Sequence, residues 1–146
     1  MSSQTIGLLI GGIIPAIIYG ISGIFSKSAM QIGMGLAPYL IITGAAIALT
    51  GLVFGMIQGD WHLSTRAGLH ALALGMTWGV GTGLVAIGLS VYNVPLGKLA
   101  PLYNMNTLVA VLLALWIFSE WSRVSVPQLL IGSMLIVIGG TMVARA

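Results

Sequence analysis

Five long apolar runs are the feature that most constrains how this chain can fold. They cover approximately residues 6–25, where the first ends at Lys27, and residues 36–57, 67–90, 96–118 and 126–143. The hydrocarbon core of a bilayer is about 30 Å thick, and a helix of about 20 residues crosses it. Short turn-forming segments separate the runs: QIGMG, QGDWHLSTR, YNVP and SEWSRVSVP. The pattern predicts an all-α integral membrane protein with five transmembrane helices in a single domain over residues 1–146.

The composition indicates that lipid is the solvent of this chain. Hydrophobic residues make up 58% of the sequence and charged residues only 5%, whereas a soluble domain carries about 25% charged residues. No Lys or Arg precedes the first run, so we expect a retained helix there and not a secretory signal. We therefore expect a multi-pass protein of the cell (inner) membrane, with the lipid bilayer as its main surroundings.

Several function classes are disfavoured by what the sequence lacks. The five basic residues are scattered one per loop or helix end, whereas nucleic-acid binders cluster them, so we predict no nucleic-acid partner. There is no cysteine, and His62 has no further ligand residues nearby, so we predict no metal site. Glycine-rich phosphate loops, carboxylate pairs and Ser/His/Asp constellations are also missing. We predict that the chain is not an enzyme and carries no cofactor.

Polar and aromatic residues inside the runs are the candidates for substrate contacts. Tyr19 and Trp78 lie near the middle of the first and third runs, away from the interfaces where aromatic residues usually anchor a membrane protein. In the fourth run, Tyr103, Asn106 and Thr107 share one face at 100° per residue. Tyr19 and Trp78 also have a purely structural interpretation, as filler between helices. We assign the shared face of the fourth run to a central cavity.

Two further polar residues of the fourth run have alternative roles. Lys98 follows the YNVP turn by one helical turn, and its amine either snorkels to the headgroups or points into a cavity to meet an anionic group. Asn104 is rotated off the shared face, and we expect it to make a helix–helix hydrogen bond. The predicted substrate-binding residues are therefore Tyr19, Trp78, Tyr103, Asn106 and Lys98.

Proline and glycine indicate where the helices deform or approach closely. Pro15 lies inside the first run, where it removes a backbone donor and kinks or opens the helix. Glycines recur every four residues in the third run (75, 79 and 83) and the second (51, 55 and 59), which places each set on one face. Close packing of neighbouring helices explains such faces, and a moving seam between them is the alternative.

The basic residues are almost evenly divided between the two sides of the membrane. Arg66 and Arg123 fall on the side of the N-terminus, and Lys27, Lys98 and Arg145 fall on the other. The positive-inside rule needs a clearer excess to fix an orientation. Either the three-residue side faces the cytoplasm, or the chain inserts both ways. Two copies of opposite orientation would form an antiparallel pair, like the inverted repeats of transporters.

The last two runs carry a resemblance to a known family. The segment NVPLGKLAPLYNMNTLVAVLLALWIFSEWSRVSVPQLLIGSMLIVIGG has a proline turn, a helix that ends in glutamate, a short basic link, and a helix that begins with a Gln-Leu segment and ends in glycines. It resembles the closing half of an EamA-like domain of the drug/metabolite transporter superfamily. The matching residues are Glu120, Gln128, Gly132, Gly139 and Gly140.

The opening run adds a weaker likeness to the same family. Pro15, Tyr19-Gly20 and Lys27 are similar to its first helix. The multidrug branch has a glutamate in that helix, whereas this chain has Tyr19 and no acid there, which argues against multidrug proton antiport. Most members carry two inverted five-helix repeats. The resemblance therefore implies that this chain is one half of a ten-helix inverted-repeat fold, completed as an antiparallel homodimer.

These observations together predict a carrier. We expect a transporter subunit that moves a small polar or amphipathic metabolite by alternating access, with the path lined by the first, third and fourth helices of each copy. Two alternatives remain open: an accessory or structural subunit that pairs with a different five-helix chain, and a passive channel.

Overall fold

The computed structural model describes residues 3–122 and 124–146 and is helical throughout its regular elements. Arg123 and the side chain of Glu120, both used in the sequence argument, lie outside the described part. Five helical stretches are long and apolar enough to cross a membrane: Ser3–Gln31, Leu36–Gln58, Thr65–Ser90, Leu96–Ile117 and Val126–Arg145. The described residues contain no strand. The prediction of a multi-pass, all-helical membrane protein with five spans is confirmed.

The chain forms two compact units, Met1–Asn93 and Val94–Ala146. The first unit contains α1 (Ser3–Leu8), the π-helix η1 (Leu9–Ile13), α2 (Ile14–Gln31), α3 (Leu36–Gln58) and α4 (Thr65–Ser90). The second contains α5 (Leu96–Tyr103), α6 (Asn106–Ile117), the 3₁₀-helix η2 (Glu120–Ser122) and α7 (Val126–Arg145). Asn93, the last residue of the first unit, adopts a left-handed φ of 51°, which asparagine tolerates better than most residues.

The first span contains a π-helical turn just before its proline. The N–H of Ile14 donates to the carbonyl of Leu9, five residues back, and Pro15 follows directly. Because Pro15 has no N–H and its ring crowds the preceding turn, the backbone there cannot keep the regular α pattern. The expected opening of the helix at Pro15 is thus a widened turn at residues 9–13, within a continuous first span.

Glycines end the first two spans in ways that the dihedral angles explain. Gly33 has φ +93°, and the paired bonds Met34 N–H to Ala29 O and Gly33 N–H to Met30 O, each 3.1 Å, form a Schellman motif. The first helix therefore continues to Gln31, past its expected end, and includes Lys27. Gly59 has φ +69° and donates to the Gly55 carbonyl over 2.8 Å.

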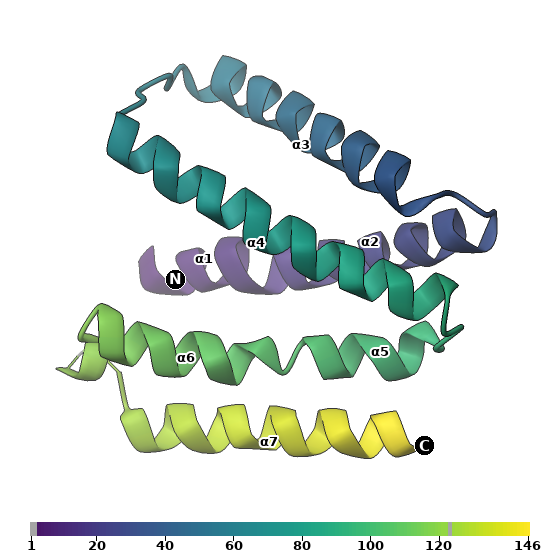
Figure 1. The fold of residues 1–146 in the computed structure, drawn as a ribbon. Coiled ribbons are helices and arrows are strands. Elements are labelled where there is room, and N and C mark those ends of the chain that lie inside the picture. The colour runs from purple at the N-terminus through teal and green to yellow at the C-terminus, as the bar shows by residue number, and fades with distance from the viewer. Residues whose placement is uncertain (1–2, 123) are drawn as a thin grey trace. The chain divides into compact units, whose positions relative to one another are not determined.

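In the first unit, α4 packs against both α2 and α3 (Figure 1). Gly83 of α4 is buried, and a Cβ placed there would lie 3.5 Å from a methyl group of Leu40 on α3. Near the same end, the hydroxyl of Tyr39 on α3 donates to the hydroxyl of Ser26 on α2 over 2.8 Å. The glycine face predicted for the third run therefore does bring helices together, at Gly83.

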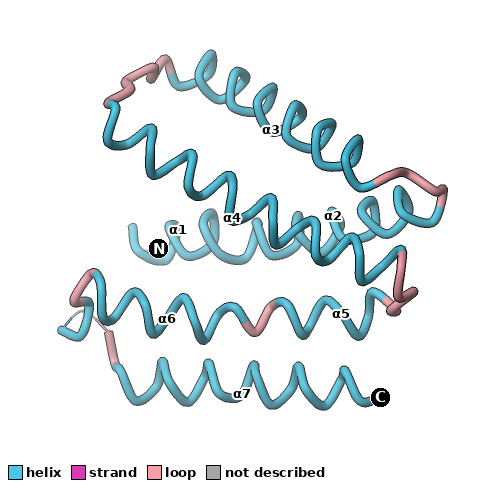
Figure 2. Tube along the Cα trace, in the orientation of Figure 1, coloured by secondary structure: helices cyan, strands magenta, loops and turns pink. Residues whose placement is uncertain are grey.

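The second unit is a helical hairpin in which α7 packs against both α5 and α6 (Figure 1). Gly140 of α7 is buried, and a Cβ there would lie 2.9 Å from the carbonyl oxygen of Pro101 on α5. The fourth span is interrupted between α5 and α6 at Asn104 and Met105, drawn as a short loop in Figure 2. The expected run of residues 96–118 is thus confirmed as the span Leu96–Ile117, and the break lies within it.

Candidate functional site

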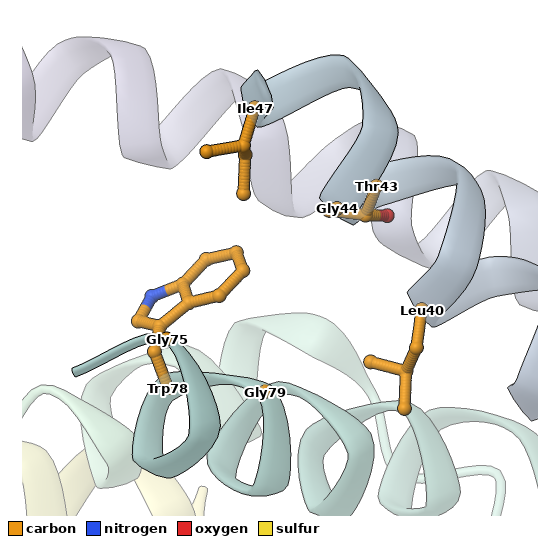
Figure 3. A pocket seen from close by; sticks show the side chains of 7 residues that line it. All are labelled: Leu40, Thr43, Gly44, Ile47, Gly75, Trp78 and Gly79. Carbon is orange, nitrogen blue, oxygen red and sulfur yellow. The ribbon is translucent and has the colours of Figure 1, made fainter. Parts of the chain in front are cut away.

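A pocket of about 290 Å³ lies between α3 and α4 of the first unit (Figure 3). Both helices are long and apolar enough to cross a membrane, and the pocket is lined by residues from the first half of α3 and the middle of α4. Its lining is mostly apolar or glycine and includes no ionisable side chain. The lining residues are Leu40, Thr43, Gly44, Ile47, Gly75, Trp78 and Gly79.

Trp78 is the largest side chain of the pocket and the predicted site residue that the structure places there. Its indole reaches from α4 toward α3 and ends near Ile47 and Gly44 (Figure 3). The side chain is 48% exposed. Its N–H makes no hydrogen bond with any residue in the described part of the chain. An indole at this depth therefore presents both a flat apolar face and an unused donor.

The three glycines of the pocket create the space that Trp78 faces. A Cβ placed on Gly44, Gly75 or Gly79 would meet nothing within 4 Å. Gly75 and Gly79 belong to the spaced set that the sequence singled out, but only Gly83 of that set is buried against another helix. Two of the three glycines on this face therefore widen the gap between α3 and α4 without closing it.

The glycine set of the second run has a different outcome. A Cβ on Gly55 would come within 2.7 Å of the ring of Trp61, Gly51 meets nothing within 4 Å, and Gly59 forms the left-handed end of α3. The proposed helix-packing face at residues 51, 55 and 59 is thus not used between the helices of this unit. The turn that ends α3 accounts for Gly59, and the ring of Trp61, which folds back over α3, accounts for Gly55.

Tyr19, the other predicted site residue of the first unit, lies on α2 and does not line the α3–α4 pocket. Its side chain is 68% exposed. The nearby hydroxyl of Ser22 donates to the Tyr19 carbonyl over 2.8 Å, which is a bond within the same helix. The structure therefore does not bring Tyr19 and Trp78 into one pocket.

The second unit carries the other three predicted residues, and all lie on or beside the interrupted fourth span. Lys98 is half-buried in the first turns of α5, Tyr103 ends α5, and Asn106 begins α6 with an exposed side chain. Tyr103 and Asn106 therefore lie on either side of the break. This placement was not visible in the 100° helical projection, because that projection assumed an uninterrupted α-helix.

Hydrogen bonds between residues three apart hold the break in shape. The N–H of Met105 donates to Leu102 O over 3.1 Å, and the N–H of Leu108 donates to Met105 O over 3.1 Å. Thr107 donates twice to the Asn104 carbonyl, from its N–H over 3.2 Å and from its hydroxyl over 2.8 Å. These are 3₁₀-type bonds. In such a turn residues i and i+3 eclipse, which aligns Tyr103 with Asn106.

The expected helix–helix hydrogen bond of Asn104 is not found among the described residues. Its side chain is exposed, and its contribution is the main-chain carbonyl that accepts both bonds from Thr107. Asn104 has φ −69° and ψ −9°, which ends α5. Asparagine favours such positions because its amide competes with regular helical bonding.

Sequence reasoning missed the contribution of α3. The second run supplies Leu40, Thr43, Gly44 and Ile47, none of which had been selected, because the path was assigned to the first, third and fourth helices. The available signal was the pair Thr43-Gly44, a hydroxyl beside a missing side chain within an otherwise apolar run.

The described residues contain no group of three or more His, Cys, Asp or Glu side chains placed to hold a metal ion. Comparison with known proteins adds no relative. No family model matches the chain, and neither a curated protein nor a solved structure matches it.

Proposed function

We propose that this chain is one half of a carrier that moves a small polar or amphipathic metabolite across the cell (inner) membrane by alternating access. The whole carrier would be an antiparallel homodimer with the ten-helix inverted-repeat arrangement of EamA-like transporters. The observation that carries the proposal is the interrupted fourth span, α5–α6, with polar side chains at its break.

The break lies close to the middle of the span Leu96–Ile117, which is where the bilayer has no water to solvate a backbone. Interrupted helices at this depth are tolerated where protein or a wet cavity surrounds them. In secondary transporters they form the substrate and ion sites near the midplane. Asn106 begins α6 and Tyr103 ends α5, and in the proposed carrier both would contact a solute at such a site.

A second, inverted copy follows from the small number of spans and from the charge balance. Five spans place the two ends of the chain on opposite sides of the membrane. Two basic residues then lie on one side and three on the other. An inverted repeat needs two halves of opposite orientation. A nearly even charge balance allows one chain to supply both halves, because neither orientation is strongly preferred.

The orientation of the chain is testable with single cysteines, because the protein has none of its own. His62→Cys and Met34→Cys place a thiol in loops on opposite sides. Labelling of intact cells with a membrane-impermeant maleimide should modify roughly half of each variant. Labelling of one variant alone would show a single orientation and refute the antiparallel homodimer. Crosslinking of purified protein separates a self-pair from dependence on a different chain, which would support an accessory subunit.

Transport is tested in proteoliposomes with a panel of labelled amines, amino acids, sugars and nucleotide-like anions. A carrier shows counterflow exchange of its substrate, whereas flux without counterflow would indicate a passive channel. Asn106→Leu should lower the transport rate at least tenfold without changing membrane insertion. Asn104→Leu is the matched control, because it makes the same change two residues away. Unchanged uptake by Asn106→Leu, or equal losses in both, would remove Asn106 from the substrate site.

A further inference from the structure

We propose that the pocket between α3 and α4 binds a small, uncharged, flat molecule that carries a hydrogen-bond acceptor and stacks on the indole of Trp78. This names the substrate class for one site of the proposed carrier and so rests on the proposed function. Binding, however, is measured without transport. Loss of binding contradicts this inference, and binding without transport contradicts only the carrier.

The absence of charge in the ligand follows from the lining. Two hydroxyl- or N–H-bearing side chains, Thr43 and Trp78, are the polar groups of the pocket, and the remainder is aliphatic or glycine. A charged ligand would leave water for a site with no counter-ion, which costs several kcal/mol or more. An amine, a carboxylate or a phosphate is therefore excluded by the pocket, whereas a carbonyl, ether or amide is compatible with it.

The acceptor follows from the two unused donors. Thr50 and Thr77, on the same two helices, donate their hydroxyls to the carbonyls of Ala46 and Ala73 over 2.9 Å each. The hydroxyl of Thr43 and the N–H of Trp78 make no such bond with residues 3–122 or 124–146. Within the hydrocarbon region a donor without an acceptor is costly. An acyl chain from the bilayer offers no hydrogen-bond acceptor. A ligand that carries an acceptor therefore binds in the pocket in preference to an acyl chain.

Size and shape follow from the volume and the glycines. A volume of about 290 Å³ is just below the range of small-molecule pockets, roughly 300–1,000 Å³, so the ligand must be small. Indole faces prefer flat partners, which stack at an offset. Gly44 on α3 and Gly75 and Gly79 on α4 leave room for a ring between the two backbones. A single-ring compound fits these limits.

The test uses Trp78 as its own reporter. Trp61, Trp116 and Trp121 are replaced by Phe, which leaves Trp78 as the single tryptophan of the four. The probe is 4-bromoacetophenone, whose carbonyl is the acceptor and whose bromine quenches indole fluorescence on contact. The charged probes 4-bromobenzoate and 4-bromobenzylamine have similar size. In detergent micelles we expect saturable quenching by the neutral probe and at least tenfold weaker saturable binding of the charged ones.

Matched variants separate the pocket from general partition into the micelle. Gly79→Leu places a side chain in the pocket, and Gly81→Leu makes the same change on the same helix outside it; a Cβ at either position meets nothing within 4 Å. Gly79→Leu should weaken binding at least tenfold, and Gly81→Leu should leave it unchanged. Thr43→Val keeps the shape but removes one donor, and should weaken binding about fivefold. This variant keeps the inference testable if Gly79→Leu does not fold.

Three results would overturn the inference. Quenching that never saturates and is equal in the two leucine variants would show partition alone. Quenching of Trp78 by a phosphatidylcholine brominated on its acyl chain, undiminished by excess acetophenone, would show that a lipid chain fills the pocket. Disulfide formation between two copies of a Gly44→Cys variant, with no probe binding, would show that a second copy occupies the pocket.

Discussion

Replacement of Gly140 by alanine tests how closely α5 and α7 approach. A Cβ at Gly140 would lie 2.9 Å from the carbonyl oxygen of Pro101, 3.4 Å from its carbonyl carbon and 3.5 Å from Cγ of Met105. The first two atoms are backbone and cannot rotate away, so α7 must move by several tenths of an ångström. Overpacking of this kind typically costs about 1–3 kcal/mol.

Gly139→Ala is the natural control, because a Cβ at Gly139 meets nothing within 4 Å. Both variants gain the same helix propensity over glycine, about 0.5–1 kcal/mol. The difference between their unfolding free energies therefore isolates the contact with Pro101. Gly140→Ala should be less stable than Gly139→Ala by about 1–3 kcal/mol, or about 5- to 150-fold in the unfolding equilibrium.

The assay is reversible unfolding in mixed micelles titrated with sodium dodecyl sulfate, followed by helical circular dichroism. Amide hydrogen exchange at Met105 supplies a second readout, because the same movement of α7 should loosen the break. A difference below about 0.5 kcal/mol, the usual limit of additivity for independent sites, would refute the backbone contact between Gly140 and Pro101.

Two further perturbations test other contacts. The 2.8 Å bond from Tyr39 to Ser26 should give a coupling energy near 0.6 kcal/mol in a double-mutant cycle of Tyr39→Phe and Ser26→Ala; coupling indistinguishable from zero would mean that it does not join α2 to α3. Pro15→Ala restores a backbone donor after the π-helical turn, so it should raise the unfolding free energy by up to about 3 kcal/mol and slow amide exchange at residues 9–14. Unchanged exchange there would mean that Pro15 is not the cause of the turn.

The number of spans and most of their ends were predictable because they depend on local chemistry. Apolar runs of bilayer length must be helical to satisfy their backbone groups in lipid. Gly33 and Gly59 end helices because they tolerate positive φ, and they do so in this structure. Pro15 likewise disturbs the helix through its own ring and its missing N–H, so the irregular turn in the first span could be predicted.

The candidate site was predictable only in part. Trp78 was selected for its depth, and it does line a pocket, whereas Tyr19 was selected on the same ground and does not. Depth along a helix fixes how far a side chain lies from the interface but not which neighbour it faces. Helix packing decides which neighbour the side chain faces. In a bilayer no hydrophobic effect drives helices together, so the buried face of a helix is not marked by apolar residues in the sequence.

By itself, the sequence determined the solvent, the helical class, the five spans and the turns, since each follows from hydrophobicity or from the dihedral freedom of single residues. The tertiary structure decided that Gly83 packs while Gly75 and Gly79 leave a pocket, that α3 supplies four of the seven residues that line it, and that the fourth span breaks at Asn104 and Met105. These features depend on how two helices approach each other and on competing hydrogen bonds across a turn. Both are relations between segments, which a one-dimensional pattern does not contain.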